Sequence, residues 1–153
     1  MNRMMDSSAS PVRVWALLLS GVALPVSTSA GERLFTSDNV AKLRVVTAVE
    51  MSPDGRQVAY VLSVPRRPFE DEDGPAWTQL HVVGADGVSS PYVAGDVNVE
   101  AVAWKPRHNT ISFLAKRGKD KTKSLYEITV YGGEALQTLT FDTDISGYSW
   151  SPD

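Results

Sequence analysis

One stretch of the sequence resembles a catalytic nucleophile motif: Gly147-Tyr148-Ser149-Trp150-Ser151. In a G-x-S-x-G nucleophile elbow, the second glycine lets a strand and a helix approach at a strained turn that exposes the serine. Here Ser151 stands in place of that glycine, Pro152 follows it, and no helix-forming sequence is visible. The pattern therefore favours a strand residue at Ser149, and we assign no catalytic residue.

The other reactive side chains do not form a metal or cofactor site. His81 and His108 are far apart and have no spaced carboxylate cluster, and the chain has no cysteine. The acidic run Glu70–Asp73 does not place its carboxylates at alternate positions around a glycine, as a calcium loop does. The basic run at 116–123 includes Asp120 and no aromatic partner. We expect both runs to be solvated loops, and we predict no metal and no cofactor.

The composition is that of an ordinary globular domain. The chain has 153 residues, a formal net charge of −3, 42 % hydrophobic residues and 22 % charged residues. No basic excess is available to neutralise phosphates, so a nucleic-acid partner is not expected. Without cysteine, a disulfide scaffold is excluded.

The N-terminus has the order of a secretory signal peptide. Two arginines precede an apolar run at 14–26, and small residues, Thr28 and Ala30, stand where a signal peptidase would require them. A membrane anchor would need about 20 apolar residues, and Pro25 interrupts this run. We predict a signal peptide over residues 1–30, no stable membrane anchor, and export to the periplasm or exterior of a bacterium.

The remainder of the chain contains an internal repeat. Residues 49–62 align with 102–115 and with 148–153. The alignment places Met51, Trp104 and Trp150 in register, as it does Pro53, Pro106 and Pro152. The proline spacings of 53 and 46 residues lie near the period of about 40–50 that is typical of propeller blades.

Each repeat has the same internal order of four predicted strands. A short apolar strand leads into a proline turn, and a second strand follows with alternating apolar residues: Val58, Tyr60 and Leu62 in the first unit, Ile111 and Phe113 in the second. A polar loop, a third strand (78–84 and 124–132), a glycine turn and a fourth strand (near 90–94 and 135–141) complete the unit. The strand positions of Trp77, Trp104 and Trp150 favour core packing.

This order predicts an all-β fold, a partial β-propeller with two four-stranded blades and the start of a third. The boundaries are a lead-in at 31–47, a first blade at 48–97, a second at 98–144, and the first strand of a third at 145–153. In the lead-in, Ser37 can cap a short helix over about 38–44 that packs against the first blade. The turn Pro106-Arg107-His108-Asn109 lacks the Asp-Gly of the first unit, and we expect His108 to help make this corner. His81 is expected to be a half-buried, hydrogen-bonded strand residue.

The segment RLFTSDNVAKLRVVTAVEMSPDGRQVAYVLSVPR, followed by GPAWTQLHVV, resembles the mature N-terminus of bacterial serine peptidases of the prolyl oligopeptidase family. The resemblance is greatest to the acylaminoacyl-peptidase and dipeptidyl-peptidase-like members. It implies a propeller followed by a C-terminal α/β-hydrolase domain that hydrolyses short peptides by Ser-His-Asp acyl transfer. The resemblance also implies peptide substrates, contact with that hydrolase domain, and association of several copies. None of the triad motifs occurs in residues 1–153, so no site residue is transferred.

Two other interpretations remain open. The first is a non-catalytic exported propeller similar to the periplasmic Tol-system protein, which binds protein partners. That protein carries a small α/β domain ahead of its blades, whereas about 20 residues separate Ala30 from the first Ser-Pro-Asp-Gly turn here. The second is a self-contained small β-domain, which would leave open strand edges. Because the chain ends at Ser151-Pro152-Asp153, within a repeat, the sequence favours a segment of a longer protein over the second interpretation.

Overall fold

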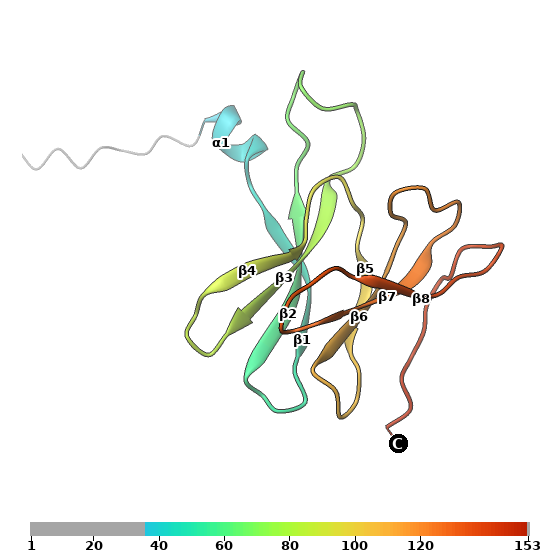
Figure 1. The fold of residues 1–153 in the computed structure, drawn as a ribbon. Helices are drawn as coiled ribbons and strands as arrows, with labels where there is room; N and C mark the ends of the chain where they lie inside the picture. The colour runs from blue at the N-terminus through green and yellow to red at the C-terminus, as the bar shows by residue number, and fades with distance from the viewer. Residues whose placement is uncertain (1–35, 153) are drawn as a thin grey trace, which may run out of the picture. The chain divides into compact units, whose positions relative to one another are not determined.

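The computed structural model describes residues 36–152, so the predicted signal peptide at 1–30 lies outside the described residues. This part of the chain is mostly β, as predicted, with two antiparallel four-stranded sheets and one short helix (Figure 1). The elements are α1 (Ser37–Ala41), β1 (Val45–Met51), β2 (Gln57–Val64), β3 (Trp77–Gly84), β4 (Ser89–Val93), β5 (Glu100–Trp104), β6 (Thr110–Ala115), β7 (Ser124–Thr129) and β8 (Leu136–Leu139).

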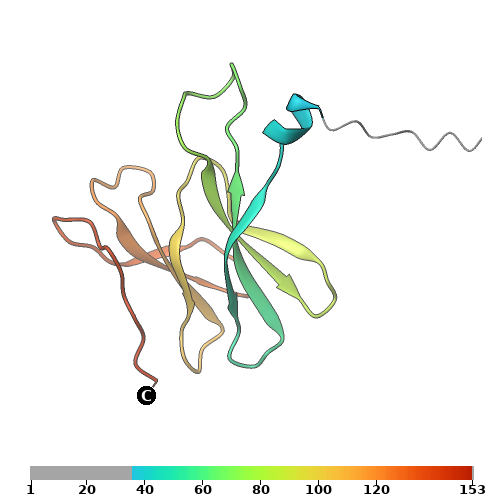
Figure 2. The same ribbon diagram turned by 180° about the vertical axis from the view of Figure 1, so that it is seen from behind.

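Each sheet is a simple meander. The first sheet has the order β1-β2-β3-β4 and the second has the order β5-β6-β7-β8, so every strand pairs with its neighbours along the chain. The turns β1–β2 and β5–β6 lie at one end, whereas the long loop between β2 and β3 lies at the other end, near α1 (Figures 1 and 2). Met51 pairs with Val58 and Trp104 pairs with Ile111, which confirms the alignment of the two repeats.

The two proline turns close in the same way but place their left-handed residue differently. The N–H of Gly55 donates to Ser52 O at 2.9 Å, and the N–H of His108 donates to Lys105 O at 3.2 Å. In the first turn Gly55 has φ of +70°, whereas in the second turn Arg107 has φ of +60°. His108 therefore helps to close this corner, as expected, although Arg107 is the residue that adopts the left-handed conformation.

The helix begins one residue earlier than predicted and is shorter. Thr36, rather than Ser37, is the N-cap, since its hydroxyl accepts a hydrogen bond from the N–H of Asn39 at 3.3 Å. Either residue type can cap a helix, so the sequence alone does not distinguish them. The apolar side chains expected to pack, Val40 and Leu43, are 52 % and 51 % exposed.

One apolar cluster joins the two sheets. From the first sheet it includes Ala59, Val61 and Leu80, and from the second Ile111 and Phe113. Trp104 belongs to this cluster and its indole N–H donates to Glu50 O in β1 at 3.0 Å. The two sheets therefore contact each other through non-equivalent faces. The first sheet contributes the face that carries Ala59, and the second contributes the face that carries Ile111, whose equivalent in the first sheet is Val58.

The two second strands differ in which residues are buried. In β2, Ala59 and Val61 are buried, while Val58, Tyr60 and Leu62 are half-buried. In β6, all residues from Ile111 to Ala115 are buried. Both faces of β6 are covered, one by the first sheet and the other by the segment that follows β8.

That segment, residues 142–152, forms no strand within the described residues. It nevertheless repeats contacts made by Val99, just before β5, and by Trp104 within β5. The N–H of Val99 donates to Thr78 O at 3.0 Å, and the N–H of Ile145 donates to Lys123 O at 3.1 Å. The indole N–H of Trp150 then donates to the hydroxyl of Ser112 at 2.7 Å, as Trp104 donates to the first sheet.

Candidate functional site

Ser149 is not part of a catalytic arrangement in the described residues. Its side chain is exposed, it makes no hydrogen bond, and neither a strand nor a helix flanks it. The two residues beside it are the ones that contact the second sheet, because the Tyr148 hydroxyl and the Trp150 indole both donate to Ser112 Oγ.

The histidines are also separated. His81 is half-buried in β3, stacks on Tyr60 with ring centroids 5.4 Å apart, and lies 3.5 Å from the Gln79 side chain, as expected for a hydrogen-bonded strand residue. Burial lowers the pKa of His81, and the positive charge of Arg44 adds to this effect. His108 is exposed in the β5–β6 turn.

Within residues 36–152, no group of three or more His, Asp or Glu residues could hold a metal ion. In the same range, every buried side-chain nitrogen and oxygen has a hydrogen-bond partner. No helix among these residues is long and apolar enough to cross a membrane.

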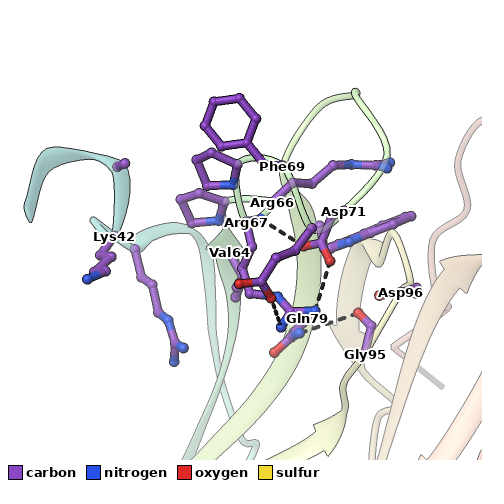
Figure 3. Close-up of a pocket in the computed structure, with 15 residues that line it drawn as sticks. Lys42, Val64, Arg66, Arg67, Phe69, Asp71, Gln79, Gly95 and Asp96 are labelled. Atoms are coloured by element: carbon purple, nitrogen blue, oxygen red, sulfur yellow. Dashed lines mark hydrogen bonds and ion pairs between the residues drawn. The ribbon is translucent and has the colours of Figure 1, made fainter. Parts of the chain in front are cut away.

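An open pocket of about 870 Å³ lies between α1 and the β2–β3 loop. Its lining is mixed, with four cationic and three acidic side chains beside apolar ones (Figure 3). The cationic residues are Lys42, Arg44, Arg66 and Arg67, and the acidic residues are Glu70, Asp71 and Asp96. A pocket with both signs of charge suits a protein segment better than a small anion.

Arg67 holds the tip of the β2–β3 loop in a tight turn. Its guanidinium contacts Glu70 Oε2 at 2.5 Å and Asp71 Oδ1 at 3.0 Å, and its backbone N–H donates to Asp71 Oδ2 at 2.7 Å. These bonds from Arg67, first the backbone N–H and then the side chain, lower the pKa of Asp71. The same pairing, led by the bond to Asp71, raises the pKa of Arg67.

Arg66 fixes the base of the same loop. Its guanidinium donates to Glu72 O and to Pro75 O, each at 2.9 Å, and lies 3.9 Å from the centre of the Trp77 ring. A side chain at Gly74 would come within 2.8 Å of this guanidinium. Trp77 is thus half-buried beneath an arginine at the pocket wall, whereas core packing was predicted for it.

Phe69 lies at the outer end of the loop. Its side chain is fully exposed, and its φ of +65° is in the left-handed region that residues other than glycine rarely adopt. Figure 3 shows its ring above Arg67 and away from Gln79 and Gly95. No motif in the sequence marks Phe69 as a functional residue. The proline and two arginines before it were the available signal, but the exposure of the ring depends on the folded loop.

The opposite wall of the pocket comes from α1 and the residues that follow it. Ala41, Lys42 and Arg44 line the pocket there. Arg44 makes no hydrogen bond or ion pair with the described residues. This wall therefore carries two cations, whereas the loop tip carries the exposed ring of Phe69 and the acidic residues Glu70 and Asp71.

Comparison with known proteins does not assign this site. The sequence matches no protein-family model and no curated protein. The function is therefore argued from the chain itself.

Proposed function

We propose that this chain is the N-terminal propeller segment of an exported serine peptidase that hydrolyses short peptides. In this proposal the two sheets are successive blades, residues 145–153 begin a third, and an α/β-hydrolase domain of the same protein carries the catalytic triad. The propeller covers the active site and admits short peptides while it excludes folded proteins.

The observation that carries the propeller is the repeated tryptophan contact. Trp104 donates to Glu50 O in the first sheet, and Trp150 donates to Ser112 Oγ in the second at 2.7 Å. The Ser112 hydroxyl donates in turn to Ala103 O, and Ala103 occupies the position in β5 that Glu50 occupies in β1. Each repeat therefore places its tryptophan over the same point of the preceding sheet, which is how blades stack around a ring.

The exposed face of the first sheet supports the same proposal. Six of its residues are exposed or half-buried, yet each has an equivalent 53 positions later that is buried against the first sheet. The six pairs are Val46 and Val99, Val49 and Val102, Met51 and Trp104, Val58 and Ile111, Tyr60 and Phe113, and Leu62 and Ala115. A preceding sheet of the same kind would cover this face in a closed ring.

The peptidase activity rests on the sequence resemblance described above. It can be tested with an antibody raised against residues 36–152, used to isolate the natural polypeptide from the exported fraction of its source. We expect a polypeptide longer than this chain, labelled covalently by a fluorophosphonate, a probe that reacts with activated serines. Its N-terminus should be Gly31 if the signal peptide is removed after Ala30.

A longer polypeptide that fails to react with fluorophosphonate would refute the peptidase and favour the non-catalytic propeller, similar to the Tol-system protein. The described residues contain no catalytic arrangement, which is compatible with that alternative. A natural polypeptide that ends at Asp153 would refute both.

A further inference from the structure

The chain contains the dipeptide Asp-Gly at three places, 54–55, 73–74 and 86–87. In this dipeptide the backbone nitrogen of the glycine can attack the side-chain carboxyl carbon of the aspartate, because glycine has no side chain to hinder the approach. A C–N bond forms, water leaves, and the product is a cyclic succinimide. Water then opens the ring at either carbonyl. One opening regenerates aspartate, and the other gives isoaspartate, in which the main chain runs through the side-chain carbon.

The turn between β1 and β2 holds both reacting groups of Asp54-Gly55. Asp54 Oδ1 accepts from the Ser52 hydroxyl at 2.6 Å and from the N–H of Arg56 at 3.1 Å. The N–H of Gly55 donates to Ser52 O at 2.9 Å. The bond from Ser52, followed by the bond from Arg56, lowers the pKa of Asp54, and an ionised carboxylate is a poorer target for attack than the acid. This turn must therefore open before the ring can form.

The turn between β3 and β4 holds Asp86-Gly87 in a similar way. Asp86 Oδ1 accepts from the N–H of Val88 at 3.0 Å. The N–H of Gly87 donates to Gly84 O, also at 3.0 Å. The carboxyl group and the attacking nitrogen are again both occupied, so this pair is protected as well.

Asp73-Gly74, in the β2–β3 loop, is not held in this way. Both residues are exposed, and within residues 36–152 neither the Asp73 carboxylate nor the Gly74 N–H has a hydrogen-bond partner. The Arg66 guanidinium instead holds the carbonyl oxygens on either side of the pair, Glu72 O and Pro75 O, each at 2.9 Å. It also lies against Gly74, where its positive charge stabilises the negative charge that develops during the attack.

We propose that Asp73-Gly74 is a modification site, at which the folded chain forms succinimide and isoaspartate spontaneously. Isoaspartate adds one carbon to the main chain between the two carbonyls that Arg66 holds. The guanidinium then loses one of these bonds and its position 3.9 Å from the centre of the Trp77 ring, which alters the pocket wall. The proposal goes beyond the proposed function and holds whether or not the protein is a peptidase.

Heavy-oxygen water measures the reaction at each pair, because the water that opens a succinimide leaves its oxygen in the product. The full-length chain is incubated in this water at neutral pH and then digested in ordinary water. Cleavage after arginine and tryptophan places the three pairs in different peptides for mass spectrometry. One hydrogen bond changes a local equilibrium by roughly fivefold, so the two bonds or more that hold each protected pair should make uptake at Asp73 at least about tenfold faster than at Asp54 or Asp86.

The unfolded chain is the matched control. In concentrated urea the turns are lost, and uptake at the three pairs should become similar. Asp73→Glu should abolish uptake in its own peptide, because glutamate would have to form a larger ring, and should leave the other two unchanged. In the folded chain, as shown by its urea transition, uptake at Asp54 or Asp86 as fast as at Asp73 would overturn the proposal. No uptake at Asp73 would do the same.

Tryptophan fluorescence tests the effect on the pocket wall. The emission should change as isoaspartate accumulates at position 73, because Arg66 moves off the Trp77 ring. The change should be absent in Trp77→Phe and in Asp73→Glu. An unchanged emission in a sample that contains the isoaspartate would refute the loss of the Arg66 contact.

Discussion

Val49 and Val102 occupy equivalent positions of the two repeats and provide a matched test of the packing. Val102 is 7 % exposed at the interface between the sheets, whereas Val49 is 60 % exposed on the outer face of the first sheet. Val→Ala removes two methyl groups, worth about 1.6 kcal/mol of transfer free energy when fully buried. At Val102 a cavity term adds to this, so Val102→Ala should lower the free energy of unfolding by about 2 kcal/mol.

At Val49 less than half of the residue's surface is shielded from solvent. Val49→Ala should therefore lower the free energy of unfolding by about 0.6 kcal/mol on the same transfer scale. Urea unfolding of the full chain, followed by tryptophan fluorescence, measures both values. It should be run at a protein concentration where light scattering detects no association. Equal losses for the two variants would refute the packing described for the two sheets.

The same pair also tests the propeller. In the longer natural polypeptide that we propose, a preceding sheet would cover Val49, and Val49→Ala should then cost about as much as Val102→Ala. If Val49→Ala hardly changes the free energy of unfolding of a longer polypeptide, no preceding sheet covers Val49 and the proposed ring of blades is refuted. Such a result would leave the two-sheet packing intact, so the two hypotheses can be separated.

Three further outcomes are expected. Ser112→Ala removes the hydrogen-bond acceptor for Tyr148 and Trp150. It should lower the free energy of unfolding by about 1–2 kcal/mol. If urea unfolding detects no loss, these two hydrogen bonds do not hold the segment on the sheet. Arg107→Gly should raise the free energy of unfolding by about 0.5–1 kcal/mol in the same assay, because glycine adopts positive φ without strain; a loss would contradict this. Burial, the largest cause in each case, raises the pKa of Tyr126 and of Tyr148 to about 12. Because the ordinary pKa of tyrosine is 10.0, the contribution of these two side chains to the free energy of unfolding is complete below pH 10.0 and is lost as the pH rises through about 12. A pH titration followed by tyrosinate absorbance should show two tyrosines that ionise later than the others. Ionisation of all the tyrosines near pH 10 would contradict the burial of Tyr126 and Tyr148.

The strand order could be predicted from the sequence because its signals are local. Proline turns and alternating apolar residues recur at fixed positions, and the pairing of Met51 with Val58 and of Trp104 with Ile111 confirms the inferred register. The errors were also local and small. Thr36 and Ser37 are both capping residues, and Arg107 and His108 are neighbours in one turn, so the choice within each pair depends on the fold around it.

The pocket could not be predicted in the same way. Its walls come from α1 and from the β2–β3 loop, which are more than 20 residues apart, and their proximity depends on how β1 and β2 pair. The exposure of Phe69 depends on the ion pairs of Arg67 with Glu70 and Asp71, which exist only in the folded loop. An apolar residue in a loop is ambiguous from sequence, because it can equally turn inward.

The two tryptophan contacts differ in one respect, and the difference explains why Ser112 is a serine. In the first sheet the position equivalent to Ser112 is Ala59, and Trp104 reaches the backbone oxygen of Glu50 directly at 3.0 Å. In the second sheet the Ser112 hydroxyl lies between, since it accepts from Trp150 at 2.7 Å and donates to Ala103 O at 3.0 Å. The hydroxyl is fully buried, and leaving it without partners would be costly. The hydroxyl therefore gives Tyr148 and Trp150 a buried acceptor on the second sheet, and these two hydrogen bonds tie the segment to that sheet as the Trp104 bond ties β5 to the first.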